Sequence, residues 1–259
     1  MINDIRNMLI ISKYTFFEVL KSKILLNVLF LGLALLGMSY AATEFTYGNP
    51  TKVALDFGLG ALSFSSVGIA IFIGVNIINK EIESRTIYII LSQPISRHSF
   101  LIGRTLGMIL LLCANIAILA TLTLIIYFIF GGIFQPLMIW CVLFVLLESV
   151  IVLNIAILFS LITNITMSVV YTIILFTLGH AVSEVLELTK GSHYADFHSI
   201  VKFSSYFLPD LSKINIKEFV LYQESLGAGY LFKAGSYGIT YIIILMLISN
   251  LIFRKKDLN

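Results

Sequence analysis

The stretch that decides the fold is Leu137–Thr163, LMIWCVLFVLLESVIVLNIAILFSLIT, in which Glu148 is the only formally charged residue. A run of about 20 apolar residues is long enough to cross the roughly 30 Å hydrocarbon core of a bilayer as an α-helix. Such a run is too long for a membrane-spanning β-strand, and it lacks the alternation of apolar and polar residues found in barrel strands. The stretch therefore predicts a transmembrane helix.

Five charge-free runs of similar length accompany it, at residues 24–43, 57–79, 105–130, 165–183 and 235–253. Across all 259 residues, 59% are hydrophobic and 12% are charged, whereas soluble domains contain about 45–50% and about 25%. The mean hydropathy of +0.99 agrees. This composition excludes a soluble enzyme, a disulfide scaffold and a disordered chain, and a net charge of +3 does not indicate nucleic-acid binding. We predict an all-α polytopic membrane protein with six transmembrane helices in a single domain, residues 1–259.

The basic residues predict how the chain is oriented, because Lys and Arg concentrate on the cytoplasmic side of membrane proteins. If the N-terminus is inside, the cytoplasmic segments hold eleven basic residues and the outer segments hold six. We therefore expect a multi-pass protein of the cytoplasmic (inner) membrane with both termini inside. The fourth and fifth spans are separated by little more than Asn164, which predicts a tight helical hairpin.

Three segments lie outside the predicted spans. Residues 1–23 place Ile2, Ile5, Leu9, Phe16, Val19 and Leu20 on one helical face, which predicts an amphipathic helix in the membrane interface. Residues 184–234 are rich in aromatic residues and predict short amphipathic helices at the outer leaflet. One of these helices is expected to begin at Asn215, with Glu218 completing a capping box.

The third segment, residues 80–104, reads KEIESRTIYIILSQPISRHSFLIGR. Charged residues begin it, and Pro94 ends any helix that precedes it, because proline has no N–H and disfavours helix at the residue before it. Ser96 is a candidate N-cap for a helix that continues into the third span. This composition fits a cytoplasmic docking element, and it equally fits a polar loop.

At this segment the sequence resembles the permease subunits of type-2 ATP-binding-cassette (ABC-2) transporters. The resemblance is carried by Glu81-x-Glu83-x-Arg85-Thr86, Leu91-Ser92-x-Pro94-Ile95-Ser96-Arg97, Phe100 and Gly103-Arg104, and also by Leu208-Pro209-Asp210-Leu211 and by Phe253 to Leu258. It is most similar to the branch for multicopper-enzyme maturation, which includes the nitrous-oxide-reductase maturation permease.

The resemblance implies that residues 80–104 couple the permease to two copies of a cytosolic ATPase, which bind ATP and Mg. The residues expected at this coupling interface are Glu81, Glu83, Arg85, Thr86, Ile90, Leu91, Pro94 and Arg97. A second copy of the chain and membrane lipid are further expected partners, and an outer-side protein is an open alternative. The sequence itself contains no phosphate-binding G-x-x-x-x-G-K-[ST] loop, so ATP hydrolysis is expected in a separate subunit.

Small residues of the second span predict where two copies pack, because such residues let helix backbones approach closely in a membrane. The candidates for this seam are Gly58, Gly60, Ser63 and Gly68, and the first and fifth spans are expected near it. Neither a metal nor a cofactor site is predicted in this chain.

Glu148 lies near the middle of the fourth span, where an ionised carboxylate is costly. It is either a polar group of the permease core, protonated or paired with Asn154, Asn115 or a tyrosine, or a neutral hydrogen-bonded residue that fixes helix packing. His180 is expected to lie at the outer interface. The function predicted from these features is that of a non-catalytic ABC-transporter permease. The alternatives are a proton-coupled secondary transporter and a non-transporting membrane subunit.

Overall fold

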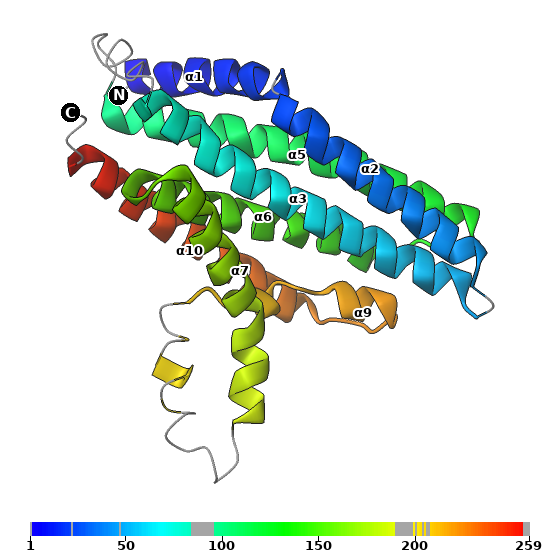
Figure 1. Cartoon of the computed structure of the whole chain (residues 1–259). Helices are drawn as coiled ribbons and strands as arrows, with labels where there is room; N and C mark the ends of the chain where they lie inside the picture. Colours follow the sequence, from blue (N-terminus) through cyan, green and yellow to red (C-terminus); the bar gives the residue numbers. More distant parts are fainter. Residues whose placement is uncertain are drawn as a thin grey trace.

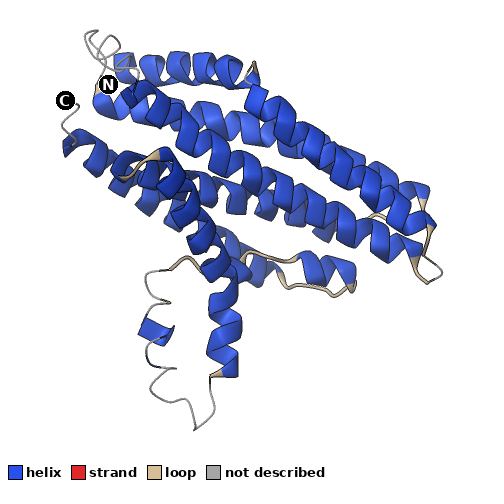
Figure 2. Ribbon diagram, viewed as in Figure 1, coloured by secondary structure: helices blue, strands red, loops and turns tan. Residues whose placement is uncertain are grey.

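The computed structural model describes the chain except for residues 1, 22, 47, 84–95, 190–198, 200, 204, 206–207 and 256–259, and it omits the side chains of 2–3, 23–29, 31, 77–78 and 80–83. The described part is helical and contains no strand (Figure 2). Its elements are α1 (Ile2–Leu20), α2 (Lys23–Glu44), α3 (Pro50–Glu83), α5 (Arg97–Ile129), α6 (Pro136–Ile162), α7 (Ile165–Leu188), the 3-10 turn η2 (Leu211–Lys213), α9 (Lys217–Leu221) and α10 (Ala228–Lys255).

Five of these helices are long and apolar enough to cross a membrane, namely α3, α5, α6, α7 and α10. The predicted first span, residues 24–43, falls on α2, a 22-residue helix that is not among these five and several of whose side chains are undescribed. The sixth span therefore stays a prediction. Both chain ends lie at one end of the bundle, together with the α6–α7 hairpin and the ends of α3 and α5 that residues 84–95 connect (Figure 1).

The helices reach beyond the predicted apolar runs, because charged residues at a helix end do not stop its backbone. The second span was predicted to begin at residue 57, but α3 begins at Pro50, a residue that suits the first turn of a helix. At its other end α3 continues to Glu83 without a break, so it has 34 residues. Likewise α10 begins at Ala228, not at residue 235.

The core of the bundle forms around α3 and α6. In the most apolar 18-residue stretch of each helix, 78% of α3 and 67% of α6 is buried inside the protein, against 22% for both α7 and α10. Gly74 of α3 permits close packing, because a Cβ atom there would lie 2.9 Å from the Cβ of Ala156 and 3.1 Å from the carbonyl oxygen of Leu153. On the other side of α6, a Cβ at Gly238 of α10 would lie 2.3 Å from the side chain of Leu147. The middle of α6 is thus enclosed by its neighbours.

The sequence correctly predicted two local features. Ser96 is the N-cap of α5, and its side-chain oxygen accepts a hydrogen bond from the backbone N–H of Ser99 at 3.1 Å. The α6–α7 hairpin turns within two residues, and its two ends are joined by a 2.8 Å hydrogen bond between the hydroxyls of Thr163 and Ser168. Both features depend on nearby residues alone.

The outer segment differs from the prediction. A five-residue helix, α9, begins with Ile216 as its N-cap, and no side chain caps it, so the capping box of Asn215 and Glu218 does not form. The segment also packs into the bundle where it was expected to lie on the leaflet. Leu211, Ile214, Ile216 and Val220 are all at most 1% exposed. Apolar burial of these side chains outweighs the local capping pattern. The other predicted helix of this segment, near 197–208, falls largely outside the described residues.

Candidate functional site

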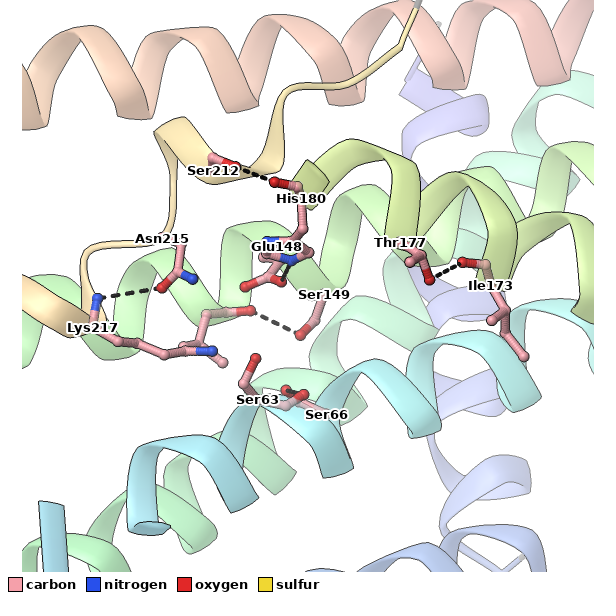
Figure 3. A network of polar contacts seen from close by, with 11 residues as sticks. Ser63, Ser66, Glu148, Ser149, Ile173, Thr177, His180, Ser212, Asn215 and Lys217 are labelled. Carbon is pink, nitrogen blue, oxygen red and sulfur yellow. Dashed lines mark hydrogen bonds and ion pairs between the residues drawn. The ribbon is translucent and has the colours of Figure 1, made fainter. Parts of the chain in front are cut away.

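A buried Glu–His pair joins α6 to α7 in the middle of the bundle. The Nε2 atom of His180 lies 2.8 Å from Oε1 of Glu148. The side chain of Glu148 is 2% exposed and that of His180 is 27% exposed. Phe176 packs edge-on against the imidazole at 4.8 Å between ring centres. Figure 3 shows the two polar side chains pointing toward each other.

This pairing corrects two sequence-based expectations. His180 does not lie apart at the outer interface, and the partner of Glu148 is neither asparagine. The amide of Asn154 donates to the carbonyl oxygen of Val150 on its own helix, at 2.8 Å. Asn115 is buried and has no hydrogen-bond partner for either side-chain atom within the described residues.

The hairpin explains why these two residues meet, and the sequence contained the signal. Glu148 and His180 each lie sixteen residues from Asn164, one on either side. Two antiparallel helices joined by a tight turn place residues that are equally distant from the turn at the same level, because each helix rises about 1.5 Å per residue. Glu148 is about 21 Å from the end of α6 at Ile162 on this scale, near the middle of the helix as predicted.

The chain that follows α7 returns to hold His180 in place. The hydroxyl of Ser212 in η2 donates to the backbone carbonyl oxygen of His180 at 2.6 Å. This contact requires a small residue one position earlier, since a Cβ atom at Gly179 would lie 2.7 Å from the carbonyl oxygen of Pro209. The glycine therefore lets the Pro209–Leu211 backbone lie directly on α7.

Asp210 fixes this return segment to two helices. Its Oδ2 atom accepts a hydrogen bond from the Ser183 hydroxyl of α7 at 2.7 Å and lies 3.1 Å from the ammonium of Lys213. Its backbone N–H donates to the hydroxyl of Tyr237 on α10 at 2.8 Å. The carboxylate is buried, so these contacts compensate for hydration that it loses on folding.

A lysine from the return segment approaches α6 near the same level. Lys217, at the start of α9, is partly buried, and its side chain extends toward α6 (Figure 3). The thiol of Cys141 on α6 lies close enough to both Lys217 and Glu148 to be affected by their charges. The predicted spans contain no basic residue at this depth, but the tertiary structure brings one in from a loop.

The hydroxyls around the pair bond mostly within their own helices. The Ser66 hydroxyl donates to the carbonyl oxygen of Ser63 at 3.0 Å, and that of Ser149 donates to the carbonyl oxygen of Val145 at 2.8 Å. These serines are small and polar, but their hydroxyls do not bond to Glu148, which is bonded to His180. Among the described residues, no three His, Cys, Asp or Glu side chains gather as metal ligands would.

A second polar cluster lies at the end of the bundle that holds both termini. The guanidinium of Arg104 on α5 forms an ion pair with Glu18 of α1 and donates to the Thr15 hydroxyl at 3.2 Å. It also lies over the ring of Phe100, 5.7 Å from its centre. The polar contacts of Arg104 tie α1 to the start of α5.

Glycines make this attachment close. A Cβ atom at Gly103 would lie 2.9 Å from the carbonyl oxygen of Met8, and one at Gly107 would lie 2.6 Å from that of Ser12. The buried face of α1 therefore contains Ser12 and Thr15 together with Val19 of the predicted stripe, whereas Ile5, Leu9 and Leu20 of that stripe are exposed. Ile5, Leu9 and Leu20 of the apolar stripe remain available to lipid, while Ser12, Thr15 and Val19 pack on protein.

Of the predicted coupling residues, Glu81, Glu83 and Arg97 are described, and these three lie at this same end. Glu81 and Glu83 form the last turn of α3, without described side chains, whereas Arg85, Thr86, Ile90, Leu91 and Pro94 lie outside the described residues. Arg97 begins α5, and its Nη1 atom donates to the backbone carbonyl oxygen of Arg254 at 3.3 Å. This contact ties the start of α5 to the end of α10.

The predicted seam residues divide between two environments. Gly58 packs inside the chain, where a Cβ atom would lie 2.5 Å from a methyl carbon of Thr123 on α5, and Ser63 is also buried. Gly68 is partly buried. A Cβ atom at Gly60 would meet no other atom within 4 Å. Gly60 lines an open groove of about 460 Å³ together with Leu35, Met38, Asp56, Phe57, Ala61 and Phe64.

Comparison with known proteins gives one family. A family model described as "ABC-2 family transporter protein" matches residues 10–207. No curated protein matches the chain. The matched range runs from α1 through α7 and includes both the Glu148–His180 pair and the contact between α1 and α5.

Proposed function

The chain belongs to the ABC-2 family of transporter membrane proteins and is a membrane permease of an ABC transporter, and we propose that a separate cytosolic ATPase drives it through residues 80–104. The observation that carries this proposal is the family match, which covers the helices on both sides of that segment. The cargo would cross the cytoplasmic membrane between two copies of the permease, each served by one ATPase subunit.

The shape of α3 supports this coupling role. Its charge-free run ends at residue 79, yet the helix continues unbroken to Glu83. Four further residues extend the helix by about 6 Å. Since α3 is also the most buried of the candidate spans, a force applied to residues 80–104 would be transmitted directly into the core of the bundle.

The basic residues support the proposed orientation. The end of the bundle that holds both termini carries Arg6, Lys13, Arg97, Arg104, Arg254 and Lys255 within the described residues. The described basic residues of the segments assigned to the other side are Lys52, Lys202, Lys213, Lys217 and Lys233. We therefore assign the end with the termini to the cytoplasm, where the ATPase would bind.

The experiment that tests this function replaces Glu83 and Arg85 together with alanine. We expect the ATPase to be lost on co-purification, or its hydrolysis to be no longer coupled to the permease. The matched control replaces Glu218 and Glu224, two acidic residues of the opposite end, and should leave both unchanged. If the Glu83/Arg85 variant retains both complex formation and coupled hydrolysis, residues 80–104 are not the coupling segment.

The proposed second copy would pack on the groove between α2 and α3. Its wall contains Phe57 and Phe64, which are 52% and 68% exposed. Cysteines placed at Phe57, Gly60 and Phe64 should form disulfides with the same positions of the second copy, or with its first or fifth span. A monomer in native mass measurement would contradict this assembly.

The Glu148–His180 pair is the one observation that favours the rival function, a proton-coupled secondary transporter. The two functions separate in membrane vesicles. An ionophore that collapses the proton gradient should leave transport by an ATP-driven permease intact, provided that ATP is present. Transport that stops with the gradient and ignores ATP would favour the rival.

A further inference from the structure

Helix α1 separates its charged residues between two faces. Both of its acidic residues are bonded to α5: Asp4 accepts a 3.4 Å hydrogen bond from a serine hydroxyl, and Glu18 forms an ion pair with an arginine. Both of its basic residues, Arg6 and Lys13, are exposed. Neither forms an ion pair within the part of the chain that the structure describes. The exposed face of α1 therefore carries positive charge that no carboxylate of the described chain compensates.

The same exposed face is apolar. Its large side chains are between 42% and 72% exposed, namely Ile5, Leu9, Ile10, Tyr14, Phe17 and Leu20. An open groove of about 460 Å³ runs along this face and is lined by Ile5, Arg6, Leu9, Ile10 and Lys13, and we call it the α1 groove. The helix cannot turn this face toward the bundle, because the close contacts of the α5 glycines fix its opposite face.

The α1 groove lies where α5 enters the membrane. The third span was predicted to begin at residue 105. Gly103, just before that residue, lies against the backbone of Met8, and Gly107, just after it, lies against that of Ser12. These two contacts fall between the two basic residues of α1 in the sequence. The groove is thus level with the boundary of the hydrocarbon core, beside which the phospholipid headgroups lie.

The side chains of the groove suit a phospholipid. The aliphatic stems of long basic residues lie along apolar surface while their charged ends reach the polar boundary. Guanidinium and ammonium groups both donate charge-assisted hydrogen bonds to phosphate oxygens. Arg6 and Lys13 are seven residues apart, so they share one face of the helix and are separated by about 10 Å along it. Both can therefore reach the headgroup of a lipid whose chains lie between them.

The charge of the face favours an anionic lipid. A basic residue near the membrane surface favours anionic over neutral lipid by about fivefold. The acidic residues of α1 do not oppose this preference, since both are bonded on the side of α5. A mixture of large apolar and basic residues is also typical of helices that lie at a membrane interface.

We propose that the α1 groove binds an anionic phospholipid, whose phosphate is held by Arg6 and Lys13 and whose acyl chains lie against Ile5, Leu9 and Ile10. The proposal concerns a lipid that the permease retains, not its cargo, and it needs neither the ATPase nor ATP. The orientation proposed above serves only to name the leaflet, which is the cytoplasmic one. Because α1 is fixed to α5 by close contacts, the lipid would lie at a constant place on the bundle.

The test measures which lipid contacts a tryptophan placed in the groove. The chain has one tryptophan, so Trp140→Phe provides a background without its fluorescence, and Leu9→Trp adds a reporter between the two basic residues. The full-length permease is reconstituted in phosphatidylcholine vesicles. Brominated phosphatidylcholine or brominated phosphatidylglycerol then replaces an increasing fraction of the host lipid. Bromine quenches tryptophan on contact, so the quenching gives the relative binding constant of each lipid. We expect phosphatidylglycerol to bind at least about tenfold more tightly.

Two double variants separate the groove from the general charge of the protein. Arg6→Gln with Lys13→Gln should bring the two binding constants to within about threefold of each other. The matched control is Arg254→Gln with Lys255→Gln, which also removes one exposed arginine and one exposed lysine from the end of the bundle that holds the termini. This control should keep the preference for phosphatidylglycerol.

Two further reporters show that the signal belongs to the groove. Ile173→Trp places the tryptophan on α7, at a side chain that is 46% exposed, and should give constants for the two lipids within about threefold of each other. If Leu9→Trp does not fold, Ile10→Trp provides the same measurement, because Ile10 also lines the groove.

The inference is overturned if the two lipids quench the groove reporter with equal constants, or if the preference survives the loss of Arg6 and Lys13. An equal loss in the Arg254/Lys255 control would also overturn it, because the preference would then come from overall charge. Quenching by neither lipid would show that protein, such as a second copy, covers this face. The measurement uses the permease alone, so its failure leaves the Glu83/Arg85 coupling experiment unaffected, and the reverse also holds.

Discussion

An ion pair and a Glu–His hydrogen bond join helices at different levels of this permease, and the two contacts differ in how much water each keeps. At the end with the termini, Arg104 of α5 binds Glu18 of α1, whose side chain is 53% exposed. Midway along α6, Glu148 binds His180 of α7, and Glu148 is only 2% exposed. One carboxylate retains much of its hydration, and the other exchanges nearly all of it for protein contacts.

The comparison shows that a similar contact has a different structural role in each place. An exposed ion pair contributes little to stability, and at the α1–α5 contact the glycines at 103 and 107 determine how closely the helices approach. A carboxylate enclosed in the bundle depends on its partner, because without one it is a buried group with no compensation. Mutations should therefore act at the α1–α5 contact through helix packing, and at the Glu148–His180 contact through the burial of a polar group that has lost its partner.

The largest effect is expected from Glu148→Lys. It would place an ammonium beside His180, with no carboxylate to bind it. Breaking a buried pair in this way costs about 3 kcal/mol or more. Thermal unfolding of the purified protein should show a large loss of stability or no folded protein. Glu148→Gln, which keeps the shape and a hydrogen bond, should assemble and retain most activity. Equal stability of the Lys variant and the parent would refute the enclosed pair.

A smaller effect is expected at the α1–α5 contact from Gly107→Leu. The new side chain would meet the carbonyl oxygen of Ser12 and the Cβ of Thr15, each 2.6 Å from the position of its Cβ. Because the backbone of α1 cannot yield as a flexible side chain would, overpacking should cost about 1–3 kcal/mol. Hydrogen exchange should increase along α1. Gly37→Leu serves as the control, since nothing lies within 4 Å of a Cβ there. Unchanged exchange in α1 would show that the glycine is not needed.

Ser212→Ala tests how the return segment supports the Glu148–His180 pair. It removes the 2.6 Å hydrogen bond to the carbonyl oxygen of His180, which should cost about 1 kcal/mol. Hydrogen exchange should rise in residues 208–216 and leave α1 unaffected. Ser236→Ala removes a hydroxyl that bonds within α10 and is the matched control. An equal response to both variants would mean that the Ser212 contact has no special role.

The smallest effect is expected from Glu18→Gln. Since Glu18 is more than half exposed, loss of its ion pair with Arg104 should change stability by no more than about 0.5 kcal/mol. That small change should disappear at high salt, which screens exposed charges. Unfolding measured at low and high ionic strength provides the check. A loss as large as that of Glu148→Lys would remove the distinction between the exposed pair and the enclosed pair.

The sequence by itself determined the membrane class, the positions of five of the spans, the tight turn at Asn164 and the cap at Ser96. Each of these depends on residues within one turn or one span. Transfer of an apolar segment into hydrocarbon is a property of about 20 consecutive residues. The cap is a contact between two residues three positions apart in the sequence. The family resemblance was likewise carried by short motifs, and the family match confirms it at the level of the ABC-2 permeases.

Only the tertiary structure decided which side chains meet. The partner of Glu148 depended on the register of two helices across the hairpin, and the approach of Lys217 depended on the folding back of a segment 69 residues later in the chain. The buried face of α1 lies against the glycines of α5 and contains Val19 alone among the fully buried members of its apolar stripe. Transfer of apolar surface into a lipid bilayer is favourable wherever that surface lies on a helix, so hydropathy locates the helices. Their mutual contacts are decided by close packing and by the pairing of buried polar groups.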